Sequence, residues 1–259
     1  MIGQRKIQNI LTFLSTESLP NTLMLLGNYG SGRHTVVTAI SKKLCLPVID
    51  ITKNLNYDYI NLIYLNTIPT IYLIDIDQIS IREQNVILKL LEEPTSSAYI
   101  ILICENKNLV INTVVNRCQI WEFEAYTKKE LQEFSSDEFL LDFCDTPGEV
   151  LLYATYDLKN MHNLIESILC NISKARFSNV LVLSEKLAYK PNDPGYDYKF
   201  FTKLLCDYCE KCYIKTGNIL YMQAFLLTKQ LINDSVNNIN RKWLYENYLL
   251  HLKTIMSKK

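Results

Sequence analysis

The sequence has no apolar run long enough to cross a bilayer. Its longest uninterrupted apolar stretch lies near Tyr99 to Cys104, whereas a membrane-spanning helix needs about 20 residues. The start, Met1 to Lys6, also lacks the apolar core and the small-residue cleavage site of a secretory signal. We therefore predict a cytoplasmic chain with no membrane partner.

The sequence has no excess of charge of either sign. Lys and Arg together number 27, and so do Asp and Glu. A chain without a net field has no global attraction to nucleic acid. Any contact with DNA must then be local, or shared with partner proteins.

The chain has few histidines that could join its cysteines as zinc ligands. A structural zinc site takes four ligands, but none of the three histidines is spaced to complete a site with Cys206, Cys209 and Cys212. We favour core cysteines on an amphipathic helix over a metal site there. Eight cysteines in an intracellular chain of 259 residues indicate reduced thiols rather than a disulfide framework.

The first half of the chain alternates between strand and helix patterns. Short apolar strands are expected at residues 22–26, 47–51, 71–75 and 98–104. Helices are expected from Ile7 to near Ser18–Pro20, at about 35–44, and after the capping box that Ser80 and Glu83 form. This alternation predicts an α/β domain with a parallel sheet.

Only helical periodicity follows Trp121–Phe123. A second capping box, Thr127 with Glu130, opens this region, and helices are expected at about 162–188, 197–215, 218–233 and 240–256. Breaks fall at Pro147–Gly148, Pro191–Gly195 and Gly217. The chain therefore changes class near residue 124, from an α/β domain to a helical second half.

A degenerate phosphate loop joins the first strand to the next helix. The loop pattern Gly-x-x-x-x-Gly-Lys-Ser/Thr holds phosphates with backbone amides and a lysine, and magnesium with a hydroxyl. Arg33 takes the lysine position, and His34 takes the hydroxyl position. The candidate nucleotide-binding residues are Gly27, Gly30, Ser31, Gly32, Arg33, His34 and Thr35. The alternative is an ordinary strand-to-helix turn.

The acid-ended strand at 71–75 lacks a catalytic base. Asp75 can stand for the magnesium-linked carboxylate of a phosphate-loop ATPase. Ile76 occupies the next position, where such enzymes carry the water-activating carboxylate, and isoleucine cannot accept a proton. Unless Asp77 is repositioned, we expect no hydrolysis and no required cofactor, although residual nucleotide binding stays open.

The sequence resembles the bacterial clamp-loader subunits of DNA polymerase III, an AAA+ family. The resemblance rests on four segments: the opening Ile2-Gly3-Gln4, the run Gln84–Pro94, the strand end Ile103–Asn106, and Asn116-Arg117-Cys118. It implies an AAA+ domain at 1–123, a lid at 124–160 and an oligomerisation collar at 161–259. It also makes Arg117 an arginine finger that reaches a neighbouring subunit's ATP; the alternative is a solvated arginine.

The departures from this family pattern indicate which subunit the chain resembles. Cys104 stands at a nucleotide-sensing position where threonine is usual, and Glu149 follows Gly148 where active members carry a lid arginine. Only Cys45 lies in the interval where many relatives carry a four-cysteine zinc module, so we predict no zinc. The resemblance therefore implies a delta-prime-like subunit.

These inferences lead to a functional prediction. The chain is expected to be a non-hydrolysing stator subunit of the DNA polymerase III holoenzyme, acting in DNA replication. Its expected partners are a gamma/tau-like motor, a delta-like clamp opener, the sliding clamp, and primer-template DNA through the assembled complex. The alternatives are an active gamma/tau-like motor and an AAA+-derived protein-binding adaptor.

Overall fold

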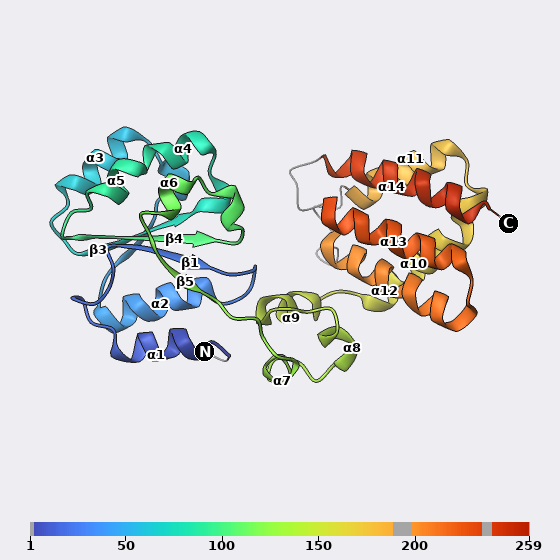
Figure 1. Ribbon diagram of the computed structural model, residues 1–259, viewed down its shortest axis with the longest axis horizontal. Coiled ribbons are helices and arrows are strands. Elements are labelled where there is room, and N and C mark those ends of the chain that lie inside the picture. Colours follow the sequence, from blue (N-terminus) through green and yellow to red (C-terminus); the bar gives the residue numbers. More distant parts are fainter. Residues whose placement is uncertain (1–2, 189–197, 235–239, 259) are drawn as a thin grey trace. The chain divides into compact units, whose positions relative to one another are not determined.

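The computed structural model describes residues 3–188, 198–234 and 240–258, which fall into two compact units (Figure 1). Unit 1 is Met1–Leu151 and unit 2 is Leu152–Lys259. The finer division at 1–123, 124–160 and 161–259 stays a prediction. Among the described helices, none is both long and apolar enough to span a membrane.

Unit 1 is built on a parallel sheet. Its strands are β1 (Thr22–Leu26), β2 (Val48–Asp50), β3 (Thr70–Asp75), β4 (Ala98–Cys104) and β5 (Gln119–Glu122). They lie in the order β2-β3-β4-β1-β5, and every pair is parallel. The carboxyl ends of all strands therefore share one edge of the sheet, where α/β proteins place their ligands. The predicted α/β fold is confirmed.

Helices cover both faces of this sheet (Figure 1). On one face lie α1 (Arg5–Phe13) and α2 (Arg33–Leu44); on the other lie α3 (Tyr57–Leu65), α4 (Ile81–Val86), α5 (Leu88–Glu92) and α6 (Asn112–Val115). Alternate strand residues enter the two cores: Ile103 joins the cluster of α1 and α2, and Leu102 joins the other. Every residue of β4 is buried, as its continuous apolar run predicts.

The α3–α5 face differs from the sequence expectation in two ways. Helix α3 was not expected, although Asn56 caps it by accepting a hydrogen bond from the amide of Tyr59. The helix expected after Ser80 has its capping box with Glu83, but it divides into α4 and α5 at Ile87, where ψ is −10°. The change of backbone conformation at Ile87 ends α4.

Short helices follow β5. They are α7 (Lys128–Leu131), α8 (Glu138–Leu141) and α9 (Pro147–Tyr153). The predicted capping box of Thr127 and Glu130 opens α7, with both of its reciprocal hydrogen bonds formed. This segment provides the residues that lie against the phosphate loop.

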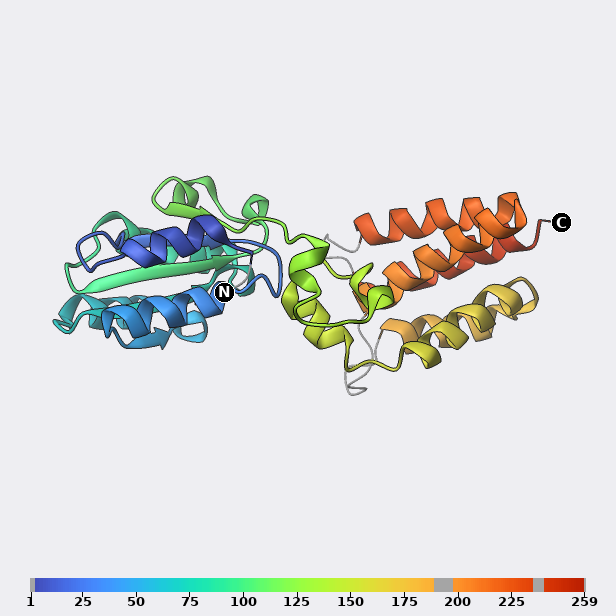
Figure 2. The same cartoon turned by 90° about the horizontal axis from the view of Figure 1, so that it is seen from below.

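Unit 2 is helical, as predicted (Figure 2). It contains α10 (Leu158–Asn171), α11 (Phe177–Ala188), α12 (Tyr198–Thr216), α13 (Ile219–Asp234) and α14 (Arg241–Met256). The helix expected over 162–188 is interrupted by a 3-10 turn at Ile172–Lys174, where the Lys253 ammonium donates to the carbonyls of Ser173 and Ala175 at 3.1 and 2.6 Å. The break predicted at Pro191–Gly195 lies outside the described residues.

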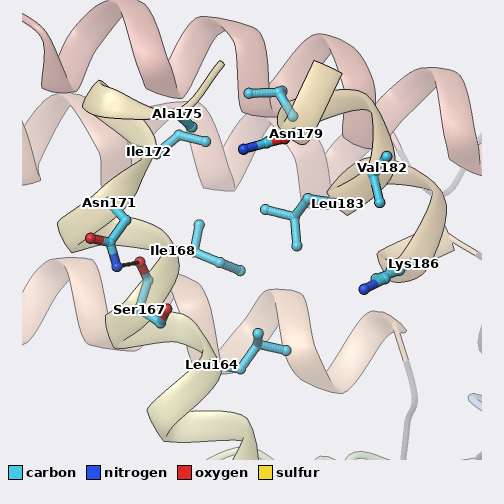
Figure 3. A pocket seen from close by; sticks show the side chains of 11 residues that line it. Leu164, Ser167, Ile168, Asn171, Ile172, Ala175, Asn179, Val182, Leu183 and Lys186 are labelled. Atoms are coloured by element: carbon cyan, nitrogen blue, oxygen red, sulfur yellow. Dashed lines mark hydrogen bonds between the residues drawn. The ribbon is translucent and has the colours of Figure 1, made fainter. Parts of the chain in front are cut away.

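Two further features belong to unit 2. An apolar pocket of about 330 Å³ lies between α10 and α11, lined by Ile168 and Leu183 among others (Figure 3). Cys206 and Cys209 are buried on α12. Within the described ranges, no three His, Cys, Asp or Glu side chains are grouped so that they could hold a metal.

Candidate functional site

The phosphate loop lies where β1 meets α2, at the carboxyl edge of the sheet. Gly30 and Gly32 have φ of +74° and +97°, a left-handed backbone that favours glycine. Gly27 is required for a different reason, since a Cβ there would lie 2.7 Å from the Cβ of Phe123. The path of the loop therefore depends on its glycines.

Arg33, in the position of the phosphate-binding lysine, turns its side chain toward two acids. It is only 6% exposed; its Nη2 donates to Glu105 Oε1 at 2.9 Å, and its Nη1 lies 3.8 Å from Asp77 Oδ2. Glu105 follows β4 and Asp77 follows β3, so both acids come from strand ends at the same edge as the loop. A cation at this position is held by carboxylates of its own chain.

The same two acids are also joined to each other. The backbone amide of Glu105 donates to Asp77 Oδ2 at 2.6 Å. Burial, followed by the negative charges of Glu105 and Asp75, nevertheless raises the pKa of Asp77 above its ordinary value. Asp77 is thus a partly buried acid that lies close to Arg33 and accepts a hydrogen bond from Glu105.

Asp75, the candidate magnesium-linked acid, is engaged in local hydrogen bonds. Its Oδ1 accepts from the amide of Asp77 at 3.2 Å, and its Oδ2 accepts from Gln78 Nε2 at 2.6 Å. The neighbouring Ile76 is buried, so no carboxylate stands at the position of the catalytic base. The Asp75 carboxylate caps the short turn that follows β3.

Three consecutive carbonyls of the phosphate loop accept hydrogen bonds from the segment after β5. Thr146 Oγ1 donates to the carbonyl of Tyr29 at 2.8 Å, and the amide of Gly148 donates to that of Gly30 at 3.0 Å. The hydroxyl of Tyr126 donates to the carbonyl of Ser31 at 2.7 Å. The loop is therefore tied along its length to residues about 100 positions later in the chain.

The contact between Gly30 and Gly148 leaves no room for side chains. A Cβ on Gly148 would lie 2.4 Å from the Cα of Gly30. The next residue, Glu149, lies at the start of α9 and accepts a hydrogen bond from the amide of Asp145 at 2.8 Å. The start of α9 contributes close backbone packing to the loop.

Two cavities flank the loop. One of about 520 Å³ brings together Gly30, Gly32, Arg33, His34 and Asp75. The other, of about 540 Å³, is lined in part by Gly27 and Ser31. Ser31 Oγ and Arg33 Nη1 are buried and form no hydrogen bond, so this edge of the sheet retains unsatisfied polar atoms.

Two of the predicted nucleotide-site residues, Thr35 and Cys104, line neither cavity. Thr35 lies exposed in the first turn of α2. Cys104 ends β4 and is fully buried, and burial raises the pKa of its thiol to about 12. A thiol with this pKa is protonated at neutral pH and has little nucleophilic character.

Arg117, the predicted finger, lies apart from these cavities, between α6 and β5. Its guanidinium is one-third exposed; Nη1 donates to the carbonyl of Thr113 at 2.7 Å, and Nη2 forms an ion pair with Glu92. The following Cys118 is partly buried, and burial raises the pKa of its thiol to about 12. Arg117 is therefore at the surface and held by its own chain.

Sequence reasoning missed several residues of the loop's surroundings. Asp77 was named only as a possible base and Glu105 only within a motif segment; their contact with Arg33 could have been found, because both follow strands whose carboxyl ends share the loop's edge. Gln4 was noted only as part of a motif, yet it is buried and its side-chain amide forms two hydrogen bonds of 2.8 Å with the backbone of Glu124. No local signal marks the roles of Tyr126 or Thr146.

Comparison with known proteins matches the middle of unit 1 to a family. Residues 64–127 match the family model described as DNA polymerase III, delta subunit. This range contains β3, α4, α5, β4, β5 and Arg117. Among curated proteins, no significant match was found.

Solved structures give matches over nearly the whole chain at low identity. The RuvB Holliday junction branch migration motor of Thermotoga maritima is 19% identical with a TM-score of 0.50, covering 96% of this chain and 88% of that one. A mutant form of the same motor is 18% identical with a TM-score of 0.51, covering 97% and 89%.

A DNA polymerase III gamma subunit-related protein of Thermotoga maritima is 14% identical with a TM-score of 0.49, covering 98% and 100%. The likeness to RuvB concerns the fold alone. The family match over residues 64–127 supports, for that segment, the resemblance to DNA polymerase III clamp-loader subunits that was read from the sequence.

Proposed function

We propose that this chain is a non-hydrolysing, delta-prime-like subunit of a sliding-clamp loader. The observation that carries the proposal is the arrangement of Arg33, whose guanidinium is buried against Glu105 and Asp77. A cation that donates to Glu105 and lies 3.8 Å from Asp77 has its charge offset by its own chain, which opposes recruitment of a triphosphate. Mg-ATP placed for hydrolysis does not fit a site in which His34 replaces the metal-binding hydroxyl and Ile76 replaces the base.

In this proposal the chain acts on a neighbour's nucleotide. Arg117 is exposed enough to be presented to another subunit, and a guanidinium offers a rigid fork of donors to the charge that develops on phosphate oxygens. The partners would be a motor subunit that hydrolyses ATP, a clamp-opening subunit, the sliding clamp and primed DNA. The helical unit 2 would serve as the collar that holds the subunits together.

The test is reconstitution of the loader with its motor subunit, clamp opener, clamp and primed DNA. Arg117→Ala should lower DNA-stimulated ATPase, because an arginine finger is worth about 10³–10⁵ in turnover at the site it serves. Arg117→Lys keeps the charge but loses the planar fork, so it should not restore full turnover. Unchanged turnover with Arg117→Ala would sink the proposed finger.

The same preparation tests the alternative of an active motor. The isolated chain should show no magnesium-dependent ATP hydrolysis above a buffer control. Turnover that disappears in Arg33→Ala would show instead that this chain hydrolyses ATP itself. Failure to assemble with any loader subunit would favour the other alternative, a protein-binding adaptor.

A further inference from the structure

The ion pair between Arg117 and Glu92 joins two segments that both belong to the family-matched region. Glu92 ends α5, and Arg117 lies 25 positions later, before β5. The side chains are partly exposed, 33% for Arg117 and 48% for Glu92. The pair is therefore accessible from solvent and could also be reached by a neighbouring subunit.

The backbone of Arg117 is fixed, so only its side chain can respond to a partner. Its amide donates to the carbonyl of Val114 at 3.1 Å, and its carbonyl accepts from Thr22 Oγ1 at 2.6 Å. Thr22 begins β1, which lies inside the sheet. Any change in the reach of Arg117 must come from rotation of the side chain away from Glu92 or Thr113.

We propose that Glu92 is a restraining residue that holds the Arg117 guanidinium on its own subunit until a triphosphate competes for it. This inference rests on the proposed function. A carboxylate and a phosphate compete for the same N–H donors of a guanidinium, and they repel each other when both lie close to it. Contact between Arg117 and a neighbour's triphosphate thus requires Glu92 to give up its hydrogen bond or to tolerate that repulsion.

The exposure of the pair sets the size of the restraint. A partly exposed ion pair contributes modestly, equivalent to a change of about twofold to fivefold in an equilibrium. A triphosphate carries more negative charge than one carboxylate, so it can displace Glu92. Salt screens exposed charges, with a Debye length of about 10 Å at 0.1 M, so the restraint should weaken as ionic strength rises.

The first experiment measures the restraint on the isolated chain, without reference to ATP hydrolysis. Phenylglyoxal modifies accessible guanidinium groups, and modification of Arg117 blocks tryptic cleavage there, which mass spectrometry quantifies. Glu92→Gln should raise the rate of modification of Arg117 by about twofold to fivefold at low salt. Glu93→Gln is the matched control, because it removes the same charge from the adjacent residue, which does not pair with Arg117.

The outcome of this experiment stands apart from the proposed function. Equal rates in wild type and Glu92→Gln would overturn the restraint even if Arg117 proves essential in the loader. Suppose instead that Arg117 is modified faster in Glu92→Gln and that Arg117→Ala leaves the ATPase of the loader unchanged. The restraint by Glu92 would then stand, and the role of Arg117 as an arginine finger would be contradicted.

The second experiment uses the reconstituted loader. Glu92→Gln should lower the concentration of this subunit that gives half-maximal ATPase by about twofold to fivefold, and the gain should shrink at high salt. Glu93→Gln should match wild type, and Glu92→Gln should have no effect in an Arg117→Ala background. Lower turnover in Glu92→Gln would mean that Glu92 orients Arg117 for the reaction, which contradicts the proposal.

Discussion

Arg33 Nη2 and Glu105 Oε1 lie 2.9 Å apart, in a contact that joins the phosphate loop to the end of β4. The residues are 72 positions apart in the chain. In a phosphate loop that binds nucleotide, the cation at this position faces the ligand. Here the fold supplies the cation with a carboxylate of its own chain.

Removal of Arg33 should therefore destabilise unit 1. Arg33→Met leaves Glu105 and Asp77 without their cation, and we expect a loss of about 1–3 kcal/mol in the free energy of unfolding. Urea denaturation followed by the fluorescence of the buried Trp121 measures unit 1, in a Trp243→Phe background that silences unit 2.

The controls for this prediction use the same background. Arg33→Met with Glu105→Gln should recover part of the loss, because one unpaired charge is removed. Lys6→Met breaks the exposed pair with Glu124 and should have little effect. If Arg33→Met left the free energy of unfolding unchanged, the buried contacts of Arg33 would not support the fold.

The raised pKa of Asp77 predicts a pH dependence of stability. The Asp77 carboxyl stays protonated to a higher pH in the folded chain than in the unfolded chain. The free energy of unfolding therefore falls as pH rises from 3.8 through the folded pKa. Asp77→Asn removes the penalty, and its melting temperature should rise relative to wild type across that window.

A residue with the opposite shift provides the contrast. Hydrogen bonds from Ser80 lower the pKa of Glu83, so this carboxylate adds stability above its unfolded pKa and the gain is lost as pH falls through the folded pKa. Glu83→Gln should therefore lose stability relative to wild type as pH rises. Parallel pH profiles for Asp77→Asn and wild type would contradict the assigned shift.

The close approach of Gly148 to Gly30 predicts a steric effect. Gly148→Ala places a Cβ 2.4 Å from the Cα of Gly30, which must push the start of α9 away from the loop. Overpacking of this kind costs about 1–3 kcal/mol. Urea denaturation with Trp121 as the reporter should show the loss, and hydrogen exchange at the amide of Gly148 should accelerate, since that amide donates to the carbonyl of Gly30.

Gly217→Ala is the comparison for that variant. Nothing lies within 4 Å of a Cβ at this position in unit 2, so only the strain of its φ of +63° applies, on the order of 1 kcal/mol. It should leave exchange at Gly148 unchanged. If Gly148→Ala left that exchange unchanged as well, the tie between α9 and the loop would not be as close as described.

The cysteines should separate by reactivity. Burial raises the pKa of Cys104, Cys118 and Cys209 to about 12, so these thiols are protonated at pH 8. Cys45 and Cys170 are exposed. A limited iodoacetamide reaction, read by peptide mass spectrometry, should label the two exposed cysteines first, and labelling in urea should reach all of them. Early labelling of Cys209 in native protein would be inconsistent with its place in the core.

Much of the fold could be predicted from local sequence patterns. The buried run of β4, the capping boxes at Ser80 and Thr127, and the helices of unit 2 each depend on neighbouring residues and their spacing. The missing lysine, hydroxyl and base were also visible, because motif positions are counted along the chain. Helix α3 and the division at Ile87 escaped notice, since packing against the sheet, not spacing alone, defines those elements.

Tertiary structure alone decided where the side chains of the site point. The partners of Arg33, Tyr126, Thr146 and Gln4 lie about 70 to 120 positions away along the chain. A hydrogen bond depends on distance and direction in space, which the order of a parallel sheet sets only after distant strands have paired. The sequence thus determined which residue types stand in the loop, and the folded sheet determined that Glu105 and Asp77 lie against Arg33.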